Sequence, residues 1–200
     1  MPLSDDKEFF ITRQDRVDVI TLASQDGMNR LRRSKVIYLT EAIRRLGDSE
    51  SPASPLVIIG QTNFSVGADL NEITALTGPE AYAFSALGQA LMQAIASYPA
   101  PVIAAIEGHC MGGGLDLALA CHRRIAAHSA VFGHRGAALG LITGWGGTQR
   151  LPRLIGKGRA LELLVAAEKV SAARALEIGL VDVIADDALA EAVRRLRPSL

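Results

Sequence analysis

The chain has 200 residues, of which 49% are hydrophobic and 21% charged, so it holds enough apolar material for a sizeable core and too much for a disordered chain. The 21 basic and 21 acidic side chains give a formal net charge of zero, which argues against a general binder of nucleic acid or of anionic membranes. Cys110 and Cys121 form no CxxC or CxxH cluster, so we expect neither a disulfide framework nor a metal site. The sequence shows no secretory signal and no apolar run near the ~20 residues of a membrane span. We therefore expect a soluble, cytoplasmic protein with one domain over residues 1–200.

Hydrophobic periodicity predicts alternating strands and helices in the first half of the chain. Residues 16–22 alternate polar and apolar side chains, as a half-buried strand does, and a helix is predicted over residues 34–46, ended by Gly47. Residues 56–60 form a continuous apolar run, which is typical of a strand in a sheet covered on both faces. A long helix is expected over residues 79–97.

The second half of the chain continues this alternation. Another buried strand is predicted over residues 101–106, followed by a helix that opens near Gly113 and a short strand over residues 124–127. Strands that alternate with helices indicate an α/β fold with mostly parallel strand pairing. The remaining elements are helices over residues 158–167 and 172–178, the apolar segment 179–184 and a last helix from about Asp187.

Two glycine-bearing segments stand where a predicted strand ends and a helix begins. Residues 63–70 follow the strand over residues 56–60, and residues 108–116 follow the strand over residues 101–106. Such junctions place free backbone N–H groups at a crevice, where they can bind a polarised carbonyl oxygen or a phosphate. Consecutive glycines also let a ligand approach the backbone without a Cβ in the way. Tight turns and close packing are the alternative role of these glycines.

Six short motifs along the chain form a specific set. They are Gly67-Ala68-Asp69-Leu70, Gly112-Gly113-Gly114 with Asp116-Leu117, Phe132-Gly133, the Gly-Trp-Gly-Gly-Thr-Gln-Arg-Leu run of residues 144–151, Met28-Asn29-Arg30-Leu31, and the segment 171–181. Together they resemble the crotonase family, the enoyl-CoA hydratase/isomerase superfamily, over about residues 16–196. The resemblance implies a crotonase-like spiral core of ββα turns over about residues 10–196. It also implies that the C-terminal helical part, which supports trimers in relatives, is largely missing.

The resemblance implies an enzyme of fatty acid metabolism, a lyase or isomerase, whose partner is an acyl-CoA thioester. The backbone N–H groups of Ala68 and Gly113 would form an oxyanion hole that holds the thioester oxygen and stabilises an enolate. Ala68, Asp69, Leu70 and Asn71 match the segment that follows the CoA moiety. Coenzyme A enters as part of the substrate, and no further cofactor, nucleic acid or membrane is expected. Relatives imply a homo-oligomer based on trimers.

The chain departs from the family pattern at the two acid–base positions. Hydratases of this family place a water between two glutamates. Asp116 stands at the first of these positions and Gly136 at the second. Ordinary two-glutamate hydration is therefore not expected, because acid–base catalysis needs groups within hydrogen-bonding reach. Asp116 is predicted to be the single acid–base residue, and a catalytically impaired acyl-CoA-binding or scaffolding protein is the alternative.

Several side chains near these positions keep more than one interpretation. Asp116 is also explained as an acid favoured by the first turn of a helix, or as a partner of His134 or Arg135. Taken alone, His134 is more typical of an ordinary surface histidine. Trp145, between two glycines, either walls the acyl pocket or packs in the core.

Overall fold

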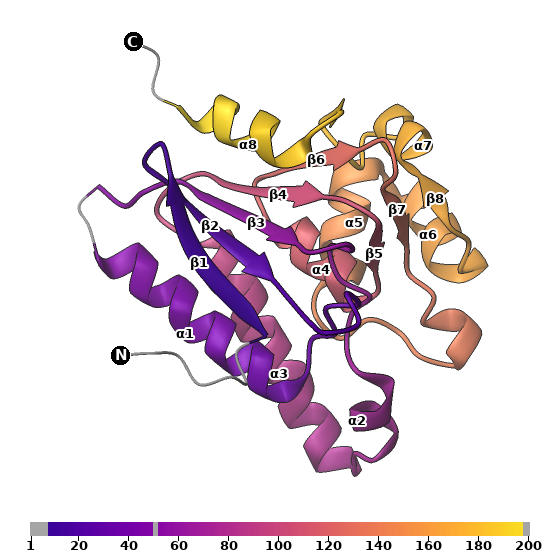
Figure 1. Ribbon diagram of the computed structural model, residues 1–200. Helices are drawn as coiled ribbons and strands as arrows, with labels where there is room; N and C mark the ends of the chain where they lie inside the picture. The colour runs from indigo at the N-terminus through magenta and orange to yellow at the C-terminus, as the bar shows by residue number, and fades with distance from the viewer. Residues whose placement is uncertain (1–7, 50–51, 198–200) are drawn as a thin grey trace.

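A six-stranded sheet forms the centre of the molecule in the computed structural model, which describes residues 8–49 and 52–197 (Figure 1). The first two strands pair antiparallel, and each of the others pairs parallel with its neighbour. This arrangement confirms the predicted α/β fold with mostly parallel pairing. In spatial order the strands are β1 (Phe9–Gln14), β2 (Val17–Leu22), β3 (Leu56–Gly60), β4 (Val102–Ile106), β6 (Arg123–Ala127) and β9 (Val183–Ala185).

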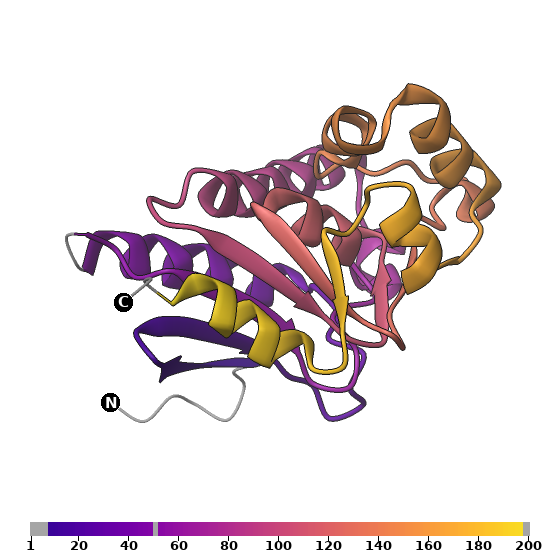
Figure 2. The ribbon, with the colours of Figure 1, turned by 90° about the horizontal axis from the view of Figure 1, so that it is seen from above.

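The central strands are buried on both faces, as the continuous apolar run of β3 predicts. Leu56 and Ile58 point into one core, and Val57 and Ile59 point into the other. Three helices cover the first face: α1 (Arg33–Ser49), α3 (Gly78–Ala96) and α4 (Gly113–Ala120). The second face packs against α8 (Ala188–Leu196), which lies across the sheet from α1 and α3 in Figure 2.

A small second sheet begins directly after β4 in the chain. It consists of β5 (His109–Met111), β7 (Val131–Gly133) and β8 (Val170–Ser171), with β5 and β7 parallel. The chain turns between β4 and β5 at Gly108, whose φ is +56°. A Cβ at this glycine would lie 2.5 Å from the carbonyl oxygen of Thr62, so the turn requires glycine.

The remaining helices lie beyond the carboxyl ends of the strands and beside the small sheet (Figure 1). None of the helices in the described part of the chain is long and apolar enough to cross a membrane. These remaining elements are α2 (Leu70–Thr74), α5 (Gly147–Ile155), α6 (Lys157–Ala166), α7 (Ala172–Glu177) and a 3-10 turn, η1 (Ala137–Leu139).

Two of the predicted elements need correction. The first helix does not end at Gly47 but continues to Ser49, and Gly47 serves close packing because its Cβ would lie 3.2 Å from Cδ of Pro99. The strand over residues 16–22 is not half-exposed: Val17 and Val19 are buried in the core under α8, and Asp18 is buried as well. The strand is buried on this face because α8, from the C-terminal part of the chain, packs against it.

Candidate active site

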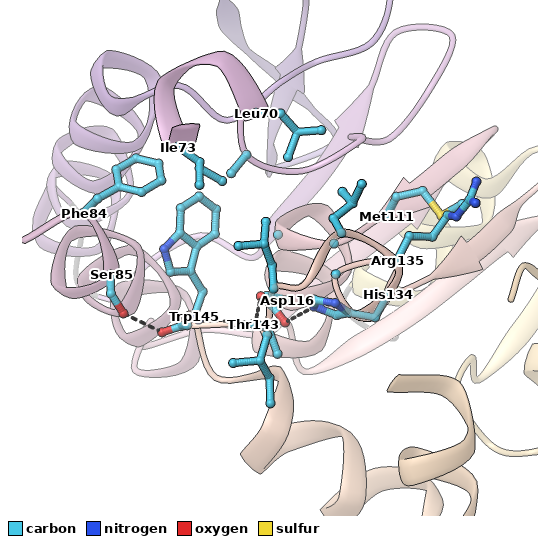
Figure 3. A pocket seen from close by; sticks show the side chains of 18 of the residues that line it. Leu70, Ile73, Phe84, Ser85, Met111, Asp116, His134, Arg135, Thr143 and Trp145 are labelled. Atoms are coloured by element: carbon cyan, nitrogen blue, oxygen red, sulfur yellow. Dashed lines mark hydrogen bonds and ion pairs between the residues drawn. The ribbon is translucent and has the colours of Figure 1, made fainter. Parts of the chain in front are cut away.

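A cavity of about 540 Å³ opens between α2, α3, the start of α4 and the segment 134–145 (Figure 3). Most of its lining side chains are apolar, and Asp116 is the one carboxylate among the described residues that line it. An apolar cavity with a few convergent polar groups is the usual form of a small-molecule site. The lining residues are Val66, Ala68, Leu70, Ile73, Leu76, Ala81, Phe84, Ser85, Met111, Gly112, Gly113, Asp116, His134, Arg135, Gly136, Ala138, Leu139, Leu141, Ile142, Thr143, Gly144 and Trp145.

The loop after β3 is held in place by buried hydrogen bonds from the segment around Asn29. The Asn29 side chain is fully buried and donates to the carbonyl oxygens of Gln61 at 3.0 Å and Asn63 at 2.6 Å. The Ser65 hydroxyl donates to the Asn29 carbonyl at 2.8 Å, and the Leu31 amide donates to a carbonyl of the same loop at 2.8 Å. These bonds fix the position of the backbone that follows Ser65.

The two glycine-bearing junctions meet at this cavity, as the sequence predicts. A Cβ on Gly67 would lie only 2.7 Å from the nitrogen of Gly113, and a Cβ on Gly113 would lie 3.4 Å from the nitrogen of Ala68. The Gly113 amide opens α4 and has no acceptor within its own helix. Neither this amide nor that of Ala68 donates a hydrogen bond to another residue in ranges 8–49 and 52–197. Two free N–H groups therefore stand on adjacent loops at one cavity.

Asp69 caps the short helix that follows this junction. Its carboxylate accepts from the Asn71 amide at 3.0 Å and from Nε of Arg32 at 2.9 Å. These contacts lower the pKa of Asp69, and the hydrogen bond from Arg32 has the largest effect. Of the four residues predicted to follow the CoA moiety, Ala68 and Leu70 line the cavity, whereas Asp69 and Asn71 do not.

Asp116 lies in the first turn of α4, only 2% exposed, with its two carboxylate oxygens in different surroundings. Oδ2 accepts a hydrogen bond from the hydroxyl of Thr143 (Figure 3). Oδ1 has no hydrogen-bond partner in the described part of the chain. Gly147 leaves just enough room for it, since a Cβ there would lie 2.3 Å from Oδ1. One oxygen is thus held by a hydrogen bond, while the other lies buried against Gly147 without one.

His134 is buried beside Asp116, so its interpretation as an ordinary surface histidine is wrong. The residue is 5% exposed, and its Nε2 lies 3.4 Å from Oδ1 of Asp116 (Figure 3). The Leu141 amide donates to the Gly136 carbonyl at 2.9 Å, and a Cβ on Gly136 would lie 3.7 Å from Nδ1 of the ring. The structure therefore brings together Asp116 and His134, which are 18 positions apart.

Trp145 both lines the cavity and packs in the core, so its two interpretations hold together. Its ring meets Phe84 edge to face, with the centroids 5.3 Å apart. It also lies so close to Gly88 and Gly113 that a Cβ at either would lie within 2.5 Å of the ring. Arg135, by contrast, is exposed at the edge of the same cavity.

Thr143 is the contributor to the site that sequence reasoning missed. Its hydroxyl donates to Asp116 and accepts from the Trp145 amide at 3.3 Å. No sequence motif identified above includes Thr143. Its position directly before the glycine-rich run 144–147 is the available signal, since that run must approach α4 closely.

Gly136 lines the cavity without offering any acid or base. Its backbone is helical, and a Cβ there would lie 2.8 Å from the carbonyl oxygen of Leu141, so a larger residue would displace that turn. The described ranges hold no group of three His, Cys, Asp or Glu side chains placed to bind a metal ion. The titratable side chains that line the cavity are Asp116, His134 and Arg135.

Comparison with known proteins identifies the family. A sequence model described as enoyl-CoA hydratase/isomerase matches residues 12–199. The chain belongs to the enoyl-CoA hydratase/isomerase family. It is 38% identical over 179 residues to a crotonyl-CoA hydratase of Syntrophomonas wolfei, covering 88% of this chain and 68% of that protein. It is 46% identical over 142 residues to a protein of Bacillus subtilis named probable enoyl-CoA hydratase, covering 70% of this chain and 55% of that one.

The fold of this family member agrees with that of a solved relative. The crystal structure of an enoyl-CoA hydratase from Bacillus anthracis superimposes with a TM-score of 0.90 at 33% sequence identity. The alignment covers 95% of this chain and 75% of that one. The predicted crotonase fold is thereby confirmed.

Proposed function

We propose that this family member binds an acyl-CoA thioester and moves a proton at the carbon next to the thioester carbonyl. The observation that carries the proposal is a buried carboxylate that lines the same apolar cavity as two backbone amides without acceptors. The name of the Syntrophomonas relative, crotonyl-CoA hydratase, supports a thioester of coenzyme A as the substrate class.

The two amides provide the electrostatic part of the proposed chemistry. Loss of the proton turns the thioester into an enolate, and its negative charge gathers on the oxygen. The N–H groups of Ala68 and Gly113 bind that oxygen, and in other enzymes each such donor contributes about 3–4 kcal/mol to the stability of the transition state. Because the backbone is fixed before the substrate arrives, no reorganisation is needed during the reaction.

Asp116 provides the base in this proposal. Its Oδ2 is held by Thr143, which fixes the orientation of the carboxylate, and the residue lines the cavity. The apolar side chains around it exclude water and strengthen the interaction of a carboxylate with an acidic C–H group.

Gly136 favours a second candidate function. Since it supplies no carboxylate, the chain could bind acyl-CoA thioesters without converting them, as a binding or scaffolding protein.

Assembly as a trimer-based homo-oligomer and a cytoplasmic location stay predictions from the family resemblance.

The test is a panel of saturated and unsaturated acyl-CoA thioesters incubated in D2O, with deuterium uptake and products followed by mass spectrometry. We expect Asp116→Asn to lower turnover 10²- to 10⁴-fold, the usual contribution of an acid–base residue, while thioester binding by calorimetry persists. The control is Asp182→Asn, which removes a carboxylate bonded to the Arg124 amide at 2.8 Å, outside the cavity lining.

Equal turnover by the wild type and Asp116→Asn would show that this carboxylate is not the base. Binding without turnover of any member of the panel supports the second candidate. Absence of binding contradicts both.

A further inference from the structure

A second cavity, of about 440 Å³, adjoins the first one, and α5 and α6 form its outer side. Its aliphatic lining includes Pro152 of α5 and Leu161, Leu164 and Val165 of α6. No carboxylate lines it within the described part of the chain, and its one lysine, Lys157, stands at the exposed start of α6. A cavity of this composition suits an aliphatic group without charge.

Four residues line both cavities: His134, Leu141, Ile142 and Thr143. Two of them are not packed in the core, since Leu141 is 40% and Ile142 78% exposed. Exposed side chains change rotamer within nanoseconds. Leu141 and Ile142 can therefore turn away from the boundary between the cavities while the hydrogen bond from the Leu141 amide to the Gly136 carbonyl stays in place.

The thioester position under the proposed function directs an acyl chain towards these shared residues. With the thioester oxygen on the amides of Ala68 and Gly113, the carbon next to the carbonyl lies at Asp116. Asp116 accepts a hydrogen bond from Thr143 and lies 3.4 Å from His134, and both of these residues also line the second cavity. Carbons further along the chain therefore point at the boundary between the two cavities.

Another side of the first cavity is closed by aromatic rings. Phe84 and Trp145 are buried and meet edge to face, and both belong to the main core cluster. A long chain would have to open this close-packed core to pass them. The segment 137–142, by contrast, consists of six apolar residues that are all exposed, so an aliphatic chain lying against it removes apolar surface from water.

We propose that the second cavity is a subsite for the distal part of the acyl chain, and that Leu161, Leu164 and Val165 set a preference for long aliphatic chains; this inference rests on the proposed function. The occupant is the hydrocarbon chain of the substrate itself. Each methylene group moved from water into apolar surroundings is worth about 0.8 kcal/mol, which corresponds to about a fourfold gain in affinity. A chain that reaches the second cavity therefore binds more tightly than one that ends in the first.

Calorimetry with butanoyl-CoA, octanoyl-CoA and dodecanoyl-CoA measures this gain without any need for turnover. Leu161→Glu places a charge at the second cavity and Val165→Trp reduces its volume, and both positions are exposed on α6. Leu176→Glu is the matched control, because this exposed leucine of α7 lines neither cavity. We expect the wild type and the control to bind dodecanoyl-CoA at least 100-fold more tightly than butanoyl-CoA. Both α6 variants should lower that ratio at least tenfold.

Failure of the inference is distinguishable from failure of the proposed function. If the wild type binds none of the three thioesters, both fail. If it binds all three equally, or if neither α6 variant changes the ratio, the distal chain lies elsewhere and only the inference is overturned. If Leu161→Glu leaves the ratio unchanged and lowers self-association in light scattering, another copy of the chain covers the second cavity, which also overturns it. Thermal unfolding verifies that each variant is folded.

Discussion

The two walls of the cavity present different chemical groups: one presents backbone amides and the other presents side chains. The first wall, residues 63–70 and 112–116, presents backbone amides held by glycines and by fully buried side chains such as Asn29. The second wall, residues 134–145, presents side chains and includes exposed apolar groups, with Ile142 78% exposed. Main-chain groups cannot be exchanged by substitution, whereas side chains can. The amides of the first wall therefore keep the task proposed for them, binding an oxygen, whatever side chains surround them, whereas the second wall can be altered by substitution.

The strongest way to break the first wall is Gly67→Ala. Gly67 has φ of +91°, and its Cβ would lie 2.7 Å from the Gly113 nitrogen and 2.8 Å from the Met111 carbonyl oxygen. Backbone strain and overpacking together should destabilise the fold by about 2–5 kcal/mol and displace an amide of the proposed oxyanion hole. Urea unfolding measures the first effect and acyl-CoA turnover the second.

Gly179→Ala is the matched control for that change. Gly179 has φ of +80° but nothing within 4 Å of its Cβ position, so only the backbone strain of about 1–2 kcal/mol should appear and turnover should persist. Equal losses of stability in the two variants would mean that the contact between the junctions contributes little.

Thr143→Val tests how the second wall orients Asp116. Removal of the hydroxyl leaves Oδ2 of Asp116 without its donor, and we expect kcat to fall about 10-fold while KM changes little, since one buried hydrogen bond to a charged group is worth about 1.5–3 kcal/mol. Thr143→Ser keeps the hydroxyl and should recover most of the rate. Failure of serine to recover it would assign the effect to packing instead of to the hydrogen bond.

The sequence predicts the first wall better than the second, because the first depends on local signals and the second on contacts between distant residues. The first wall depends on local signals, namely glycines at strand ends, which predict two junctions with free amides at one crevice, and the family resemblance assigns these amides to Ala68 and Gly113. His134 is buried beside Asp116, which is distant in the sequence, so neighbouring residues carry no sign of its burial.

The helix α5 shows the same limit in the fold. It begins at Gly147, after Gly146 with φ of +102°, and contains Pro152, so its sequence is typical of a loop. Packing overrides these local preferences: Leu151 and Ile155 are buried in the main core. Contacts made across the fold, which no short window contains, decide both α5 and His134.

Gly136→Ala tests whether the second wall tolerates a side chain at this position. The backbone at Gly136 is helical, so the expected cost of about 1–2 kcal/mol comes from the 2.8 Å approach of Cβ to the Leu141 carbonyl. Gly158→Ala, in α6 with nothing within 4 Å, should instead stabilise by about 0.5–1 kcal/mol. Thermal unfolding of both variants gives the signs, and a stabilising Gly136→Ala would contradict the predicted clash.

The smallest expected effect is a pH dependence at the edge of the first wall. Asp69 has its pKa lowered by Arg32 and by the Asn71 amide, so its folded pKa lies below the unfolded value of about 3.9. A lowered pKa gives stability that is present above the unfolded pKa and lost as the pH falls through the folded pKa. Because Arg32 is half-exposed, the contribution should be about 1 kcal/mol or less. Unfolding free energies of the wild type and Asp69→Asn should therefore differ by a constant amount above about pH 5 and converge as the pH falls below 4. A difference that persists unchanged to pH 2 would mean that Asp69 acts as a neutral helix cap and that its charge adds nothing to the rigidity of this wall.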